Sequence, residues 1–166
     1  MERSGPPVRQ YAVHFFTPSF QFSGQLEIIG NLLDFLNDTR RDVLICQQVR
    51  IVPLKPGLRE LTRPSISIRK TEFVLLYFDD PSAQSEMRLL TRAETTVIYT
   101  DLAIVRGDVH LPAEARANDF LAAVSGILLP VTSVSLFKVV EFPLPFPDHC
   151  DLLLVGRDYI QMYHPV

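Results

Sequence analysis

The chain has 166 residues, of which 47% are hydrophobic, with eleven Phe and five Tyr but no Trp, and its formal net charge is −3. This composition is typical of a folded protein with a well-filled core, and it excludes a wholly disordered chain. No apolar run approaches the roughly 18–20 residues that a membrane-spanning helix needs, so we expect no membrane contact. Because the first residues lack a signal pattern, we expect a cytoplasmic protein.

The opening strands are predicted from residue type and alternation. Residues 11–16 and 95–99 are rich in β-branched and aromatic side chains, which favour short strands. Residues 20–28 then alternate apolar and polar side chains with the period of a half-buried strand. Residues 103–111 repeat this pattern, which is the first indication of an internal repeat.

Four matched residues are predicted to have structural roles. Gly24 and Gly107 lie at equivalent places inside the alternating strands, so we expect a bulge or a close backbone approach at each. A short apolar helix is predicted after each of these strands, with Asn31 as the N-cap of the first. Asp34 and Asp119 fall in the first turns of these helices, where a carboxylate favours the positive end of the helix dipole.

A third strand and a closing hairpin are predicted in each part of the chain. The third strands are expected over 43–52 and 127–137, and prolines end both stretches. The first hairpin is expected to turn at 70–72 and the second at 156–158. We expect the polar, proline-interrupted segment 79–93 to be a linker.

These matches predict a tandem duplication with an offset that moves from 83 through 85 to 86 residues. We expect a flexible tail over 1–10, a first β-rich repeat over 11–78, the linker over 79–93 and a second β-rich repeat over 94–166. The predicted fold class is mainly β (α+β): two copies of a small antiparallel sheet or partly open barrel, each with one short helix. Because one module buries little surface alone, we expect the copies to pack with pseudo-twofold symmetry.

The charge is distributed unevenly between the two repeats. Residues 40–70 carry eight basic and two acidic side chains, a net charge of +6, whereas residues 94–166 carry four basic and nine acidic ones, a net charge of −5. A basic region of this density can neutralise phosphates or steer contact with an acidic protein surface. The candidate ligand-binding residues of this region are Arg40, Arg41, Arg50, Arg69 and Lys70.

No catalytic or metal-binding set is predicted. The four histidines have no second ligand at metal spacing, and the sequence has no glycine-rich phosphate loop. Cys46 and Cys150 are interpreted as buried apolar thiols, and the adjacent Asp79 and Asp80 as solvated linker charge. We therefore expect no catalytic residue, no metal and no cofactor.

The segment from Arg116 to Leu121, between a glycine-containing strand and an apolar strand, resembles a family of small bacterial domains with the pattern Arg-x-x-Asp-x-Leu-Asn. The first copy keeps Asp34 to Asn37 of this pattern, whereas the second has Ala122 in place of the asparagine. The resemblance implies no particular activity. The order of elements is also similar to that of small Sm-like barrels, which bind RNA or act as oligomerisation modules, but this is an analogy of fold alone.

Three functions are compatible with these observations. The favoured hypothesis is a non-enzymatic scaffold or protein-interaction module, with a protein partner or self-association through an exposed sheet edge. The alternative is a regulatory domain that binds nucleic acid or a small anion through the basic region. Nucleic acid is not favoured, because the chain is acidic with a pI near 5.8. A small enzyme with an unrecognised site is least favoured.

Overall fold

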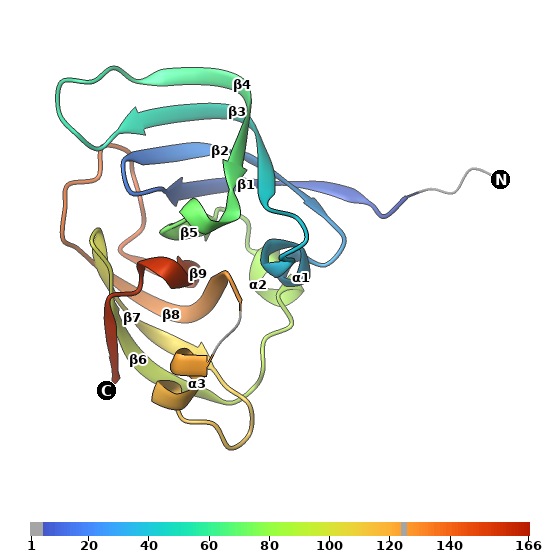
Figure 1. The fold of residues 1–166 in the computed structure, drawn as a ribbon, viewed down its shortest axis with the longest axis vertical. Coiled ribbons are helices and arrows are strands. Elements are labelled where there is room, and N and C mark those ends of the chain that lie inside the picture. Colours follow the sequence, from blue (N-terminus) through green and yellow to red (C-terminus); the bar gives the residue numbers. More distant parts are fainter. Residues whose placement is uncertain (1–4, 124–125) are drawn as a thin grey trace.

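The protein is mainly β, as the sequence predicts. The computed structural model describes residues 5–123 and 126–166, and its ten strands form one open antiparallel sheet in the order β10-β6-β7-β8-β9-β5-β1-β2-β3-β4 (Figure 1). The strands are β1 (Val8–Phe16), β2 (Phe20–Ile29), β3 (Val43–Pro53), β4 (Leu61–Arg69), β5 (Leu75–Phe78), β6 (Ala93–Tyr99), β7 (Ala103–His110), β8 (Leu128–Lys138), β9 (His149–Gly156) and β10 (Met162–Pro165).

Three short helices and two 3-10 turns connect the strands. The helices are α1 (Leu32–Asn37), α2 (Ser82–Glu86) and α3 (Ala117–Ala123), and the turns are η1 (Lys70–Glu72) and η2 (Arg157–Tyr159). α2 lies inside the segment predicted as a linker. Among residues 5–123 and 126–166, no helix is long and apolar enough to cross a membrane.

The sheet has two halves that meet in its middle. Residues 8–78 supply the strands from β5 to β4, and residues 93–165 supply those from β10 to β9 (Figure 1). The halves meet where β5 pairs with β9, with Leu75 opposite Val155 and Leu76 opposite Leu154. The first strand starts at Val8, inside the predicted flexible tail, of which residues 1–4 lie outside the described residues.

The two closing hairpins are absent from the described sheet, and that prediction is wrong. β4 pairs with β3, whereas β5 pairs with β1 and β9; β10 likewise pairs with β6 instead of β9. The physical reason is that η1 and η2 redirect the chain. A tight 3-10 turn between two strands carries the second strand away to the far side of its own half.

The expected pseudo-twofold packing is also not observed. A twofold contact would join equivalent strands, because the same surface must meet itself. Here β5, the last strand of the first half, pairs with β9, the fourth strand of the second half. The contact is therefore head-to-tail, and it leaves β4 and β10 as the two edges of the sheet.

The bulges predicted at Gly24 and Gly107 are confirmed. The pairing of β2 with β3 shifts register across Gly24, and that of β7 with β8 shifts across Gly107. The extra residues opposite them, Gln48 and Ser133, adopt positive φ values of 52° and 51°. Neither glycine leaves room for a side chain, since a Cβ at Gly107 would lie 2.8 Å from the carbonyl oxygen of Thr132.

The helix starts combine a predicted and an unpredicted cap. The side chain of Asn31 accepts a hydrogen bond from the Asp34 amide at 3.1 Å, so Asn31 is the N-cap of α1 as expected. Asp119 lies in the first turn of α3. At the start of α3, the side chain of the distant Glu94 accepts a hydrogen bond from the Ala117 amide at 3.1 Å. This bond satisfies one of the backbone N–H groups that have no partner within the helix.

Two interlocking hydrophobic clusters form the interior. The first contains most of the apolar side chains of residues 11–87 together with Leu152 and Leu154 from β9. The second contains those of residues 98–155 together with Phe16 and Leu75 from the first half. Each cluster therefore includes side chains from both halves, which stabilises their contact.

We expect Gly24→Ala to lower the free energy of unfolding by about 1–3 kcal/mol, because overpacking forces neighbouring groups to shift. The new Cβ would lie 2.8 Å from the Cys46 sulfur and 2.9 Å from the Gln47 carbonyl oxygen. Urea denaturation measures the change. Gly5→Ala is the control, since nothing lies within 4 Å of its Cβ. Equal midpoints for the two variants would contradict the close approach.

Burial raises the pKa of the Cys46 thiol from 9.0 to about 12. The unfolded chain then loses this proton first as the pH rises, so the folded state loses stability between about pH 9 and pH 12. The slope attributable to one such group is at most about 1.4 kcal/mol per pH unit. We expect Cys46→Ala, compared with the unsubstituted chain by urea denaturation between pH 8 and 10.5, to show a shallower decline. Parallel declines would contradict this assignment.

Candidate functional site

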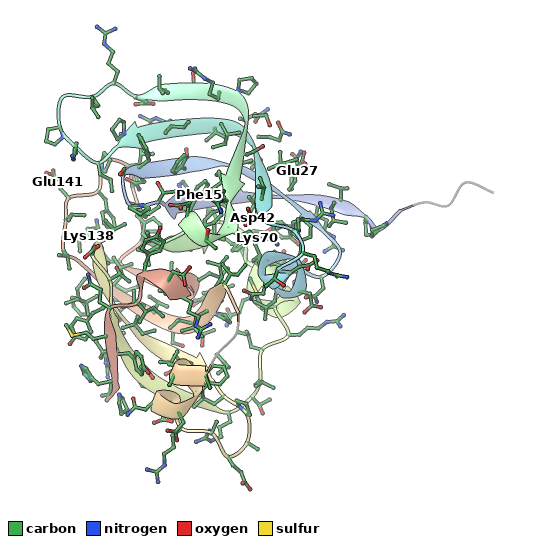
Figure 2. All side chains as sticks on the ribbon, in the orientation of Figure 1. Phe15, Glu27, Asp42, Lys70, Lys138 and Glu141 are labelled. Carbon is green, nitrogen blue, oxygen red and sulfur yellow. The ribbon has the colours of Figure 1, made fainter. Side chains whose placement is uncertain are left out.

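Four of the five candidate basic residues surround the C-terminal end of α1. Arg40 and Arg41 follow this helix, Arg69 is the last residue of β4, and Lys70 comes directly after it. The Lys70 amide donates to the Asp42 carbonyl oxygen at 2.8 Å, which fixes the two segments together (Figure 2). Arg50 lies apart from them, in β3 beside Thr62 of β4.

Lys70 is wholly buried and caps a helix. Its Nζ donates to the carbonyl oxygens of Phe35 at 2.5 Å and Asp38 at 2.9 Å. These carbonyls lie at the end of α1, where the last C=O groups have no partner within the helix and a cation is favoured. Burial lowers the pKa of the Lys70 ammonium. The side chain is therefore occupied in the interior and does not face a ligand.

The exposed arginines are mostly paired with carboxylates. Arg40 contacts Asp38 at 3.0 Å, Arg69 contacts Asp42 at 3.5 Å, and Arg50 forms an ion pair with Glu60. Arg41 lies over the Phe35 ring, 5.1 Å from its centroid. The five residues therefore do not converge on one anion cradle, and the pairing with acids reduces the positive field of the region.

A hollow of about 270 Å³ lies beside the junction, and it brings together several polar residues. Its lining includes Tyr77, Asp79, Asp80, His149, Cys150 and Asp151. Burial raises the pKa of Cys150 to about 11. A nucleophilic cysteine needs a lowered pKa, so the shift has the wrong direction for thiol catalysis. Within the described ranges no group of three or more His, Cys, Asp or Glu could hold a metal ion.

β4 forms a free and exposed edge of the sheet. Within the part of the chain that the structure describes, this nine-residue strand pairs only with β3, and most of its residues are exposed. Because bonded and non-bonded pairs alternate in an antiparallel ladder, the Lys70–Asp42 bond implies that the amides of Ser67 and Arg69 point away from β3. These amides are available to another strand.

The side chains around this edge are partly apolar and partly basic. Val43 and Ile45 of β3 are 37% and 42% exposed, and they pair with Arg69 and Ser67 of β4. Pro64 lies opposite Gln48, where the pairing of β3 with β4 is interrupted, so the continuous pairing next to the free edge runs over residues 65–69. The opposite edge, β10, is short and ends at Pro165.

Two residues at the junction were not predicted from the sequence. The Asn37 side chain accepts from the amides of Ile127 and Leu128 at 2.7 and 2.8 Å and donates to the Leu128 carbonyl at 3.2 Å. Gly156 donates its amide to the Val74 carbonyl at 2.9 Å. The Asp-x-Leu-Asn pattern of residues 34–37 contained the signal for Asn37, but no local pattern indicates its partner.

Comparisons of the chain with known protein families, with curated proteins and with solved structures found no match, so its function is inferred from the geometry alone.

We expect Lys70→Met to lower the free energy of unfolding by about 2–3 kcal/mol, because two buried carbonyls lose their donor. Arg41→Met is the matched control, since Arg41 lies over the same ring but is exposed, and we expect it to cost less than about 1 kcal/mol. Urea denaturation compares them. A larger loss for Arg41→Met would contradict the capping role.

Proposed function

We propose that this chain is a non-enzymatic scaffold or protein-interaction module, built from two copies of one β unit, that takes an extended partner segment onto the β4 edge. The observation that carries the proposal is the exposed, one-sided pairing of β4. An unpaired strand edge offers a row of backbone donors and acceptors, and adding a partner strand to it is a common mode of recognition.

Three features support the proposed duplication. Each half places its fifth strand beside its first, each has a bulge at the matched glycine, and each has a 3-10 turn before its last strand. In the strand pairing, each residue of β4 and β5 lies 87 positions before its counterpart in β9 and β10, whereas the sequence match gives 86. Val43 faces Arg69, whereas Leu128 faces Gly156.

The proposed partner is an extended, acidic segment with alternating apolar side chains. Val43 and Ile45 supply an exposed apolar face beside the edge, and Arg63 and Arg69 lie on β4 itself. An acidic segment would find Arg63 just before the 65–69 stretch and Arg69, which also contacts Asp42, at its end. The segment that contains this edge favours such a partner, since residues 40–70 carry a net charge of +6 from eight basic and two acidic side chains.

The alternative of nucleic acid or a small anion has less support. Three of its five candidate arginines and lysines are paired with carboxylates, and Lys70 is buried. A small enzyme is the least supported alternative, and burial that keeps the Cys150 thiol protonated argues against a nucleophilic thiol.

Strand addition is tested with a labelled eight-residue peptide that alternates valine and glutamate, with binding followed by fluorescence anisotropy. Ser67→Pro removes a backbone N–H that points away from β3 and makes no hydrogen bond with that strand. We expect this change to weaken peptide binding at least ~10-fold. Ser67→Ala keeps the amide and is the control. We expect Arg63→Gln to weaken binding and to reduce its salt dependence.

Equal binding by the Ser67→Pro and Ser67→Ala variants would rule out strand addition at this edge. An affinity for a single-stranded oligonucleotide that exceeds that for the peptide, and that falls steeply with salt, would favour the nucleic-acid alternative instead.

A further inference from the structure

The junction between the halves depends on a glycine that permits backbone contact. A Cβ placed on Gly156 would overlap the Phe73 carbonyl oxygen, and the Gly156 amide donates to the neighbouring Val74 carbonyl at 2.9 Å. Phe73 directly follows η1, so the chain entering β5 passes closely over the end of β9. Only glycine at position 156 allows this approach.

Two further contacts complete the junction. Asn37 of α1 exchanges three hydrogen bonds with the backbone at Ile127 and Leu128, at the start of β8. Leu152 and Leu154 of β9 are 5% and 0% exposed, and they belong to the hydrophobic cluster of the first half. The contact thus combines a close backbone approach, a polar anchor and an apolar face.

The free edge differs from the junction at each of these positions. Arg69 pairs with Val43 of β3, and Gly156 pairs with Leu128 of β8. Because Val43 and Leu128 are matched positions of the two halves, Arg69 corresponds to Gly156. Ser65 and Ser67 correspond to Leu152 and Leu154 in the same way. In the helices, Ala122 corresponds to Asn37, three residues after the matched Asp119 and Asp34.

We infer that the β4 edge of one molecule is closed to the β10 edge of a second copy. A head-to-tail contact can repeat without limit, so a second copy on β4 would begin a ring or a fibre. At β4 the Cβ of Arg69 blocks the close approach, Ala122 offers no anchor, and serines replace the leucines. The inference rests on the duplication proposed above, and it removes the β10 edge of a second copy from the strands that β4 can accept.

This closure explains how apolar residues at β10 are tolerated. Met162 is 57% exposed, whereas its counterpart Leu75 at the junction is wholly buried. An exposed apolar side chain on an edge strand invites pairing, and proteins block such edges with charges and prolines. Here the block lies on the complementary edge, at Arg69, and Pro165 limits β10 itself.

The decisive variant opens the edge by restoring three of the junction's features: Arg69→Gly, Ser65→Leu and Ala122→Asn together. We expect sedimentation of the unsubstituted chain at about 100 µM to show single chains. At this concentration, a self-association with a dissociation constant of about 1 µM would be nearly complete. We expect the triple variant at the same concentration to form dimers and larger species.

Cross-linking identifies the contact. In the junction Leu154 faces Leu76, so the corresponding contact between chains would bring Ser67 of one molecule opposite Tyr163 of the next. Chains with Ser67→Cys and chains with Tyr163→Cys, both carrying Cys150→Ser, are mixed and treated with a short thiol-reactive linker. We expect a product from the mixture in the triple-variant background, and none from the mixture in the native background.

A cross-linked product from the mixture in the native background would overturn the inference, as would a triple variant that folds but stays single-chain. If the triple variant fails to fold, the native-background mixture still decides the matter. Binding of the valine–glutamate peptide separates the two proposals. If the native protein self-associates through this contact and also binds the peptide, the closure is overturned and the proposed function stands. If the protein stays single-chain and binds no peptide, the closure stands and the proposed function is overturned.

Discussion

The pairing of β5 with β9 is the interaction on which the rest of the molecule depends. Only two residue pairs form there, yet all four side chains are buried, because each half supplies apolar groups to the core of the other. A unit of about 70 residues buries a smaller fraction of its surface than a chain twice as long, and it is marginal alone. The shared core therefore makes the two halves one cooperative structure, in which a change at the junction weakens both.

The direction of this contact determines what the two edges can be. A twofold junction would have left two identical edges, so any protection needed by one would have been present in both. A head-to-tail junction leaves two different edges that are complementary in principle. Under the proposed duplication Arg69 stands in the place of Gly156, so a difference at one position of one edge is enough to oppose polymerisation.

Local signals in the sequence were sufficient for what is local in the fold. Alternation gave the strands, Gly24 and Gly107 gave the bulges, and Asn31 gave the helix cap, because each depends on neighbouring residues. The partner of a strand does not depend on its neighbours, so η1 was interpreted as a hairpin turn although β5 crosses to β1. Lys70 was missed as a cap for the same reason, since its carbonyl partners are more than thirty positions away in the chain.

A strand edge carries little specificity of its own, since its backbone donors and acceptors are the same for every sequence. Selectivity at β4 must then come from the side chains beside it and from what they exclude. Under the proposed strand addition, the Cβ of Arg69 opposes a strand that enters by a close backbone crossing, as β5 does at Gly156. The proposed function and the proposed closure of the edge to β10 of a second copy therefore place two roles on the same residue.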